Sequence, residues 1–389
     1  MNRVECRERV LAALNLEKPD RVPTHALAVY NADEILNKPR RSTFDVIDQL
    51  IENNPNNWLD VLNKVVDGYE KSIFGTMAEA AIELGLDTIQ CGILPYKFIN
   101  KEELSDIYGR IWKMVDIGHG RLDPYFMHGT IGSVEKWEVV KQKFEDEYTK
   151  QYTRKAKKLY RGVNMKYKNK ILITVETVFT GIFESAWEGM NTTFFFKQLH
   201  KNPKFVKDVY DTNANFNIAM FNAYMDAGAE VFCEAGDLAF KTGPFYNPKL
   251  YEELLQPAYK KLTDAVHDRG GKIFLHTDGQ ITSLLDFIIN SGFDGLQGLE
   301  PTAGMDIGAV RKKVGNKLCL LGNIDVSHVL TKDGTKQDVF DAVKNAIKSA
   351  GQDGSLIISP ANMHHEVLPQ QLRWMVEATH KYGTYPLNL

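Results

Sequence analysis

The sequence lacks several features that would assign it at once to a familiar class of protein. Its four cysteines, Cys6, Cys91, Cys233 and Cys319, form no CxxC pair, which favours buried thiols of a reducing compartment over a disulfide framework. No apolar run approaches the roughly 20 residues that a membrane-spanning helix needs. The first residues mix acidic and basic side chains and contain no apolar core or cleavage site, unlike a signal peptide. These features predict a soluble cytoplasmic protein.

The chain also has little net charge. A formal net charge of -3 over 389 residues gives no electrostatic reason to expect binding to nucleic acid or to an anionic membrane. Hydrophobic content of 43% and aromatic content of 11% are ordinary for a globular protein. No glycine-rich phosphate loop follows the first predicted strand, which argues against a doubly wound nucleotide-binding sheet.

Short apolar runs alternate with amphipathic stretches through most of the chain. The runs have the length of buried strands, and the stretches between the later runs have helical spacing. Eight strand candidates can be counted, six of them in strict strand–helix alternation, which favours a (β/α)8 barrel over an open doubly wound sheet. The candidates span residues 22–30, 86–92, 171–178, 230–237, 272–279, 295–300, 318–325 and 355–359.

Two elaborations are expected on this barrel, although the whole chain, 1–389, is predicted to be one domain. Residues 3–14 predict an N-terminal helix ahead of the first strand. After the second strand, over 94–165, the pattern changes to short pieces rich in glycine, tyrosine and histidine, which predict a hairpin-rich insertion. Because function concentrates in such loops, this insertion is interpreted as a lid or substrate-facing region. A highly charged, solvated helix is expected within it, over 135–159.

Polar side chains end almost every predicted strand. In a parallel barrel the reactive groups lie at the carboxyl ends of the strands, on one face of the molecule. Carboxylates and imidazoles are costly to desolvate there unless they are paired or bind a ligand, so this rim is predicted to be an active site. The candidates are Glu176, Glu234, Asp237, His276, Asp278, Glu300, Asn323 and His364.

His276 and Asp278 form the centre of this predicted site. Side chains alternate between the two faces of a strand, so these two residues point the same way where their strand ends. A histidine and a carboxylate on one face can bind a metal, hold a polar substrate or transfer protons. Glu234 and Asp237 lie three residues apart across a turn, so both need not face the site.

Several segments carry a resemblance to a known family. They are residues 8–14 and 17–23, the Gly236-Asp237 turn with Gly243-Pro244-Phe245, His276–Gly279, Gly322–Asp325, and 375–386. In this order they resemble the uroporphyrinogen decarboxylase superfamily, and within it the corrinoid-dependent methyltransferases. The most similar branch is the methyltransferase component of aryl methyl ether, or vanillate, O-demethylases. The resemblance implies a TIM barrel, which agrees with the strand pattern.

Three branches of this superfamily make different demands on the sequence. The decarboxylases have an arginine-rich segment after the first strand, whereas this chain has no arginine between that strand and Arg40. The thiol-methylating branch binds zinc through a His-x-Cys pair and a later cysteine, where this chain has Asp278 and, near the second position, Asn362. An oxygen-rich site is less suited to activating a thiol than a thiolate-rich one. The remaining branch transfers a methyl group from a methylated donor to the cobalt of a corrinoid protein.

The resemblance therefore implies a methyltransferase that removes the methyl group of an aromatic methyl ether. His276, Glu234 and Asp278 are then the candidate catalytic residues and candidate zinc ligands. Asp237, Asn323, His364, Glu176 and Glu300 are the candidates for binding the substrate. The aromatic residues expected to form a pocket for a flat donor are Tyr96, Phe98, Tyr108, Trp112, Tyr125, Phe126, Phe179 and Trp187.

The expected partners are a corrinoid (cobalamin) protein and a small methylated aromatic compound, with a homodimer implied by the family alone. Three alternatives stay open. The enzyme could transfer a methyl group from the corrinoid to a thiol or folate, or it could decarboxylate a uroporphyrinogen-type acid. The rim could also serve only for docking, in a non-enzymatic corrinoid-binding or tetrapyrrole-binding scaffold.

Overall fold

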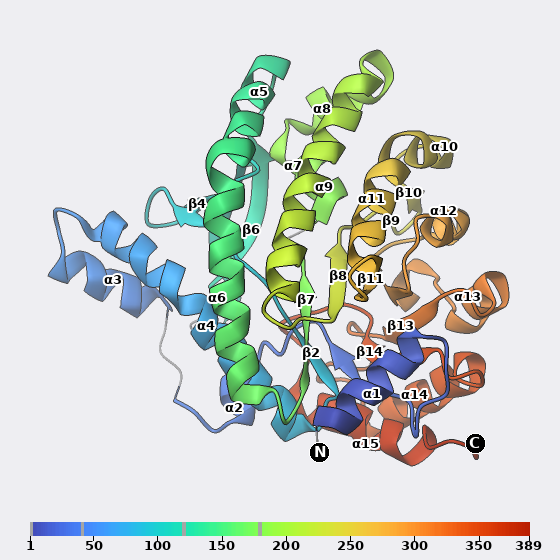
Figure 1. The fold of residues 1–389 in the computed structure, drawn as a ribbon. Coiled ribbons are helices and arrows are strands. Elements are labelled where there is room, and N and C mark those ends of the chain that lie inside the picture. The colour runs from blue at the N-terminus through green and yellow to red at the C-terminus, as the bar shows by residue number, and fades with distance from the viewer. Residues whose placement is uncertain (1–2, 40–42, 119–121, 178–180) are drawn as a thin grey trace.

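Eight parallel strands form the centre of the molecule in the computed structural model, which describes residues 3–39, 43–118, 122–177 and 181–389 (Figure 1). Neighbours in the sheet follow chain order, and a bridge between Thr24 and Ile358 joins the last strand to the first. The sheet therefore closes, and the predicted (β/α)8 barrel is confirmed. The strands are β1 (His25–Ala26), β2 (Thr88–Cys91), β7 (Leu172–Glu176), β8 (Val231–Ala235), β11 (Lys272–Thr277), β12 (Gly295–Gly298), β13 (Cys319–Ile324) and β14 (Leu356–Pro360).

A layer of helices surrounds the strands, and each strand is followed by one helix of this layer (Figure 1). None of the helices in the described ranges is long and apolar enough to cross a membrane. The helices of the layer are α4 (Trp58–Leu84), α6 (Thr149–Tyr167), α9 (Pro203–Met225), α11 (Gln256–His267), α12 (Leu285–Asn290), α13 (Ile307–Val314), α14 (Lys336–Ala350) and α15 (Pro369–Tyr382).

The predicted N-terminal helix is confirmed as α1 (Arg3–Leu14). Its Val10 and Leu14 pack with Leu172 and Phe274 in the cluster that fills the interior of the barrel. This places α1 at the amino ends of the strands, opposite the rim where the polar residues gather (Figure 1). The burial of these side chains gives α1 a structural role.

A buried ion-pair network ties α1 to the first two strands. Asp87 is 0% exposed, and its carboxylate accepts from Arg9 Nη1 at 2.5 Å and from Arg21 Nη1 at 2.9 Å. The same carboxylate accepts from the Thr24 backbone N at 2.9 Å, while Asp20 binds the other side of the Arg9 guanidinium at 2.6 Å. The Asp-Arg pair in the segment 17–23, which contributes to the family resemblance, thus serves the fold at the end of the barrel away from the rim.

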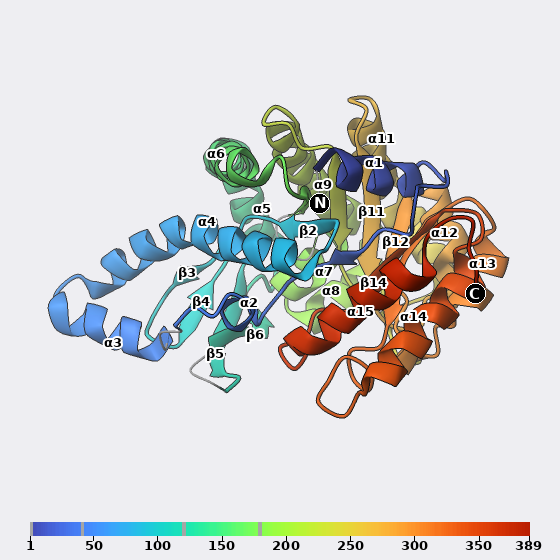
Figure 2. The same cartoon turned by 90° about the horizontal axis from the view of Figure 1, so that it is seen from below.

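The insertion after β2 contains a four-stranded antiparallel sheet of β3 (Lys97–Phe98), β4 (Glu103–Ser105), β5 (Arg110–Asp116) and β6 (Leu122–Gly129). It shares a small apolar cluster with α3 (Thr43–Asn53) and the first half of α4, including Ile47, Leu62 and Trp112. Figure 2 shows α3 and the start of α4 projecting from the barrel beside β3 and β4.

Two sequence predictions differ from the structure. The first strand, predicted over residues 22–30, is reduced to His25–Ala26, which pair with β2, and to the bridge from Thr24 to Ile358. The charged helix predicted over 135–159 is α5 (Val134–Lys143), a π-helical turn and α6, and it is not solvated on all sides. Trp137 of α5 enters the main core and donates to Asp208 of α9 at 3.1 Å. The following helix, α6, is the barrel helix after β2 and also packs against α9.

Candidate active site

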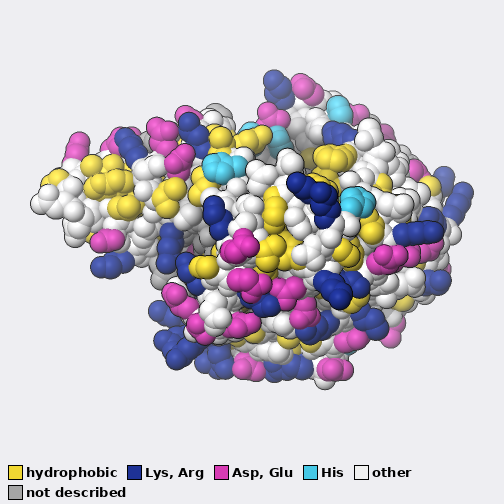
Figure 3. Space-filling view, turned by 90° about the horizontal axis from the view of Figure 1, so that it is seen from above, with side chains coloured by type: hydrophobic (Ala, Val, Ile, Leu, Met, Phe, Trp, Pro, Cys, Tyr) yellow, Lys and Arg dark blue, Asp and Glu magenta, His cyan; other side chains and the backbone are white. Residues whose placement is uncertain are grey.

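The rim of the barrel at the carboxyl ends of the strands carries the polar residues, as the sequence predicts. Figure 3 looks onto this face, where hydrophobic, charged and histidine side chains lie close together around the middle. His276 is in the interior-facing row of β11, since Phe274, two residues before it, belongs to the interior cluster. Asp278 follows directly after the strand. His276 and Asp278 were predicted to lie on one face of the strand, and this agrees with their close approach in the structure.

Asp237, His276 and Asp278 form a triad whose potential ligand atoms all lie within 4.8 Å of one another. The backbone N of Asp278 donates to Oδ1 of Asp237 at 2.9 Å, which holds the two loops together. The Oδ1 atom of Asp278 is buried and has no hydrogen-bond partner among the described residues. Unsatisfied buried oxygens are rare, so this atom points to a ligand.

The electrostatics of the triad favour a cation. Burial raises the pKa of the Asp278 carboxyl well above its ordinary value, and the nearby Asp237 and Glu300 raise it further. Asn362 and Lys241 act in the opposite direction, but the Lys241 ammonium is also 3.4 Å from Glu300. A divalent cation would offset the surplus of acidic groups. One imidazole and two carboxylates are a donor set that zinc accepts, so the residues present fit such an ion.

The orientation of the His276 ring is set by Gln297 of β12. The Gln297 amide nitrogen donates to the backbone oxygens of Pro360, at 3.1 Å, and Ala361, at 3.3 Å. Its oxygen is thereby directed to Nδ1 of His276, with which it is in contact. Because an amide oxygen only accepts, Nδ1 is the donor in this contact, and Nε2 is the ring nitrogen left for a ligand. This is the arrangement that metal-binding histidines use.

Two loop features complete the triad. Asn362 Nδ2 donates to Oδ2 of Asp278. These are the two residues that stand at, or near, the cysteine positions of the thiol-methylating branch, and the structure brings them into contact. Gly279 has φ of 84°, and an added Cβ would lie 2.3 Å from the backbone oxygen of Ala239. The loop after β11 therefore requires glycine here, because the hairpin of β9 (Ala239–Phe240) and β10 (Gly243–Pro244) lies against it.

The structure does not bring Glu234 of the predicted metal set into the triad. Cys233 and Ala235 belong to the interior cluster, so the side chain between them faces the helical layer. Its Oε1 accepts from the backbone N of Ile182 at 2.6 Å, in the first turn of α7 (Gly181–Gly189). The carboxylate that joins His276 and Asp278 is Asp237 instead, beyond Gly236.

The position of Glu234 predicts a pH effect on stability. Burial raises the pKa of Glu234 to about 8, whereas an unfolded glutamate has a pKa near 4.3. Its contribution to stability is therefore complete below the unfolded pKa and is lost as the pH rises through about 8. We expect Glu234→Gln to gain stability relative to the wild type between pH 5 and pH 8.5, measured by urea unfolding. The exposed Glu253→Gln should show no such trend, and a constant difference for Glu234→Gln would contradict this assignment.

Four predicted site residues remain to be placed. Glu176 lies near the triad: its Oε2 accepts from Gln90 Nε2 at 2.8 Å, and desolvation raises its pKa, which His276 lowers in part. Glu300 contacts Thr302, and its charge raises the pKa of Asp278, as described above. Asn323 donates to the backbone oxygen of Met305 at 3.1 Å. His364 has a side chain that is 44% exposed and stacks on His365, so the structure does not bring it to the triad.

A buried acidic pair beside the triad was not predicted from the sequence. The backbone N of Asp237 donates to Glu184 Oε2 at 3.2 Å, and Glu188, one turn later on α7, pairs with Arg110 of β5 at 2.8 Å. Burial raises the pKa of Glu184 well above its ordinary value and that of Glu188 to about 7. The sequence did contain a signal for this pair, because Glu184 and Glu188 lie four residues apart in an otherwise apolar helix and therefore share one face of it. These contacts connect the insertion to the rim.

The predicted aromatic residues are divided among several environments. Trp112, Phe126 and Trp187 form a row of edge-to-face contacts, with ring centroids 5.6 and 6.2 Å apart. Tyr96 contacts Trp112 from the buried side and Phe98 lies in the same small cluster. In contrast, Tyr108 packs in the main core and Tyr125 is 65% exposed. Phe179 lies outside the described residues.

Two further aromatic residues, which were not predicted, continue this row toward the loop after β8. Trp187 contacts Phe245 at 5.6 Å, and Phe245 contacts Phe240 at 4.2 Å between ring centroids. Phe240 is 58% exposed. Its backbone oxygen accepts from Gln280 N at 2.9 Å, two residues after Asp278. The row therefore runs from the insertion to the β9–β10 hairpin, whose backbone contacts the loop that follows Asp278.

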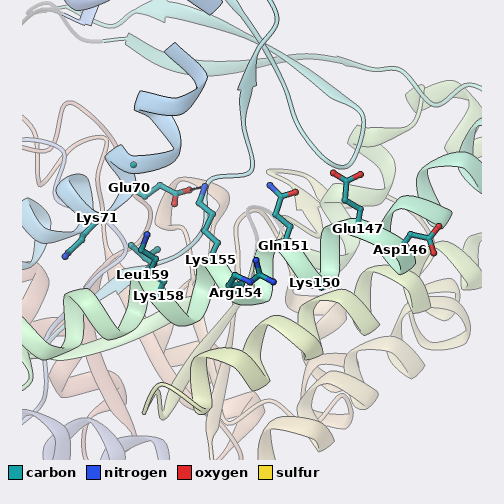
Figure 4. A pocket seen from close by; sticks show the side chains of 11 residues that line it. Glu70, Lys71, Asp146, Glu147, Lys150, Gln151, Arg154, Lys155, Lys158 and Leu159 are labelled. Atoms are coloured by element: carbon teal, nitrogen blue, oxygen red, sulfur yellow. Dashed lines mark ion pairs between the residues drawn. The ribbon is translucent and has the colours of Figure 1, made fainter. Parts of the chain in front are cut away.

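A separate pocket lies between α4 and α6, in the outer helical layer (Figure 4). It has a volume of about 630 Å³ and charged walls. Glu70 and Lys155 form an ion pair in it, with 3.0 Å between the oxygen and nitrogen atoms, as the dashed line marks. None of the described residues that line it is a predicted site residue, so this pocket is distinct from the rim.

Comparison with known proteins agrees with this geometry. Residues 113–382, more than half of the chain, match the family model described as uroporphyrinogen decarboxylase (URO-D). The chain belongs to the uroporphyrinogen decarboxylase family. The matched region holds β7 to β14 and every member of the triad, and the family predicted from short motifs is confirmed.

Curated relatives within the family have different activities. The chain is 26% identical over 210 residues to uroporphyrinogen decarboxylase of Coxiella burnetii, covering 50% of this chain and 54% of that protein. It is 25% identical over 199 residues to methylcobamide:CoM methyltransferase MtbA of Methanosarcina acetivorans, covering 51% and 56%. The chain thus spans about half the length of the curated relatives that it matches.

A solved structure supports the fold over the whole chain. A methyltransferase from Methanosarcina mazei superposes with a TM-score of 0.69 at 15% identity, covering 97% of this chain and 98% of that one. At this identity the likeness establishes the barrel fold, and the activity depends on the site.

Proposed function

We propose that this member of the family is a corrinoid-dependent methyltransferase that acts as the demethylating component of an O-demethylase. It would transfer the methyl group of an aromatic O-methyl ether to the cobalt of a separate corrinoid protein. The observation that carries the proposal is the Asp237–His276–Asp278 triad at the barrel mouth, where the oxygen-rich ligand set lies beside a row of aromatic side chains.

The reaction needs help at the ether oxygen. The bond between that oxygen and the methyl carbon breaks, a bond between the methyl carbon and cobalt(I) forms, and the aryl oxygen leaves with the electron pair. A zinc ion held by the triad would supply a Lewis acid for this leaving oxygen. The Asp278 carboxyl, with its raised pKa, is the group of this chain that can give the oxygen a proton when no ion is bound.

The aromatic row supports a flat, apolar donor. Trp187, Phe245 and Phe240 form a continuous row of ring contacts that ends in the β9–β10 hairpin, against the loop that follows Asp278, and such surfaces favour offset or edge-on contact with another ring. A partly exposed Phe240 fits an open rim, since the methyl carbon must be approached closely by cobalt on a docked protein.

A second candidate is transfer of a methyl group from a corrinoid to a thiol, because relatives include methylcobamide:CoM methyltransferases. The ligand set favours the ether reaction over this one. Asp278 and Asn362 are in contact where that branch places cysteines, and carboxylate or amide oxygens raise the nucleophilicity of a bound thiolate less than sulfur ligands do.

These alternatives are separated by one set of assays with the purified protein. Incubation with cob(I)alamin and 2-methoxyphenol is expected to give methylcobalamin and catechol, followed by the change in visible absorbance. Methylation of a thiol from methylcobalamin without any ether turnover would move the protein to the thiol branch. Release of carbon dioxide from a porphyrinogen acid, with neither methyl reaction, would support a decarboxylase instead.

A further inference from the structure

A layer of buried polar residues lies beneath the triad, inside the barrel. His25 of β1 pairs in register with Thr88 of β2, and Thr88 pairs with Leu172, which belongs to the interior cluster. Gln90 lies two residues after Thr88 and therefore shares its face. The His25 ring packs edge-on against Phe274, with centroids 5.7 Å apart. These three polar side chains therefore point into the barrel, and we call them the floor.

The floor residues are almost completely buried and incompletely hydrogen-bonded. His25 is 0% exposed, Thr88 1% and Gln90 4%. Both ring nitrogens of His25, the Thr88 hydroxyl and the Gln90 amide oxygen have no partner in the described part of the chain. A buried polar group that stays unsatisfied destabilises the folded protein. Four of these atoms on adjacent strands indicate a site for a polar group that enters the barrel.

The floor is connected to the triad. Gln90 donates through its nitrogen to Glu176 at 2.8 Å, and this leaves its oxygen to accept from a ligand. His276 acts electrostatically on both His25 and Glu176, and no described lysine or arginine acts on either of them. The floor is thus rich in acceptors, has few donors and contains no fixed positive charge. A group that can both donate and accept fits it, whereas a carboxylate would be buried among these floor side chains with no fixed positive charge to pair with.

We propose that His25, Thr88 and Gln90 form a subsite that binds a hydroxyl group of the methyl donor. The subsite rests on the proposed function for the identity of its ligand, and it specifies the donor class as uncharged methoxyphenols in preference to methoxylated carboxylates. The hydroxyl hydrogen is donated to the Gln90 amide oxygen. The hydroxyl oxygen accepts from Thr88 or from the protonated nitrogen of His25.

Binding measured without any corrinoid tests this subsite. Isothermal titration calorimetry of the full chain is expected to give a dissociation constant for 2-methoxyphenol about tenfold lower than that for methoxybenzene. 2-Methoxybenzoate should bind most weakly. Thr88→Val and Gln90→Leu should each remove most of the preference for the phenol. Equal affinities for the phenol and methoxybenzene, no measurable binding of the phenol, or tightest binding of the benzoate would overturn the subsite.

The thermal midpoint of the ligand-free protein is a second readout. A ligand subsite and a purely structural floor predict changes of opposite sign in this midpoint for Thr88→Val. Replacing an unpartnered buried hydroxyl by a methyl group of the same shape is neutral or stabilising, so Thr88→Val should keep or raise the thermal midpoint of the ligand-free protein. If the floor only holds structural water, Thr88→Val will lower the midpoint and leave the ligand preference intact. The exposed Thr193→Val on α8 (Thr192–Lys201) is the matched control and should change neither quantity.

The two proposals fail in different ways. A phenol preference that depends on the floor, together with no methyl transfer to cobalamin, would contradict the proposed function and keep the subsite. Methyl transfer from methoxybenzene and 2-methoxyphenol with equal affinity would keep the proposed function and reject the subsite.

Discussion

Replacement of His276 by alanine is expected to slow methyl transfer from 2-methoxyphenol to cob(I)alamin at least about a hundredfold. His276 would supply the nitrogen ligand of the proposed metal site, and its Nδ1 contacts the amide oxygen of Gln297, which leaves Nε2 for the metal. Without His276, Asp237 and Asp278 would remain as two neighbouring carboxylates with no imidazole to complete the set. The rate is measured by stopped-flow absorbance of cobalamin, and the metal content by mass spectrometry of the purified variant.

The control for this prediction is a histidine on the same side of the molecule. His328 follows β13, has a side chain that is 74% exposed and pairs only with Asp325 among the described residues. His328→Ala should therefore keep the wild-type rate and the wild-type metal content. A His276→Ala variant that retains full methyl transfer would show that the triad is not the reactive site.

Replacement of Asp87 by asparagine should cause the largest loss of stability in the chain, about 3–5 kcal/mol in the free energy of unfolding. The carboxylate is 0% exposed and holds Arg9 and Arg21, both nearly buried, at the amino end of the barrel. Removing its charge takes an ion pair from each of these buried guanidinium groups, and among the described residues Arg9 keeps only its pair with Asp20. Urea unfolding followed by circular dichroism measures the effect.

A surface ion pair supplies the comparison for Asp87. Asp264 pairs with Lys260 at 3.0 Å on α11, and both side chains are more than half exposed. Exposed pairs contribute about 0–1 kcal/mol, so Asp264→Asn should unfold close to the wild type. If Asp87→Asn is equally mild, the network is not what fixes α1 to the barrel, and the apolar contacts of α1 would have to do so.

The barrel could be predicted from the sequence because most strands are short apolar runs separated by helices of regular spacing. The shortest strand, His25–Ala26, shows the limit of this reasoning. Residues on either side of it are apolar and buried, such as Val22 and Leu27, but they pair with no neighbouring strand. Apolar character predicts burial, whereas the extent of pairing depends on how the barrel closes.

The site was predicted in part, and the reason lies in strand alternation. His276 and Asp278 could be assigned to one face because β11 changes from apolar to polar at its end. The strand Val231–Ala235 offers no such signal, since all five of its residues are buried, and the inward face could not be chosen between Cys233 and Glu234. Asp237 reaches the triad only because the chain turns at Gly236, which side-chain pattern alone does not specify.

Contacts between distant segments were beyond the sequence argument. Gln297 was visible as part of a strand, but its role follows from the backbone oxygens of Pro360 and Ala361, which fix its amide. Thr88 and Gln90 of the floor were not predicted, because the property that they share with His25, the lack of partners in a closed interior, exists only once the barrel has formed.

The central claim is most directly tested by following the methyl group itself. 2-Methoxyphenol carrying a trideuterated methyl group is incubated with the protein and cob(I)alamin, and the cobalamin product is analysed by mass spectrometry. We expect trideuteromethylcobalamin together with unlabelled catechol, formed by the wild type and not by His276→Ala. Recovery of the labelled ether unchanged, from protein that is folded and loaded with metal, would contradict it.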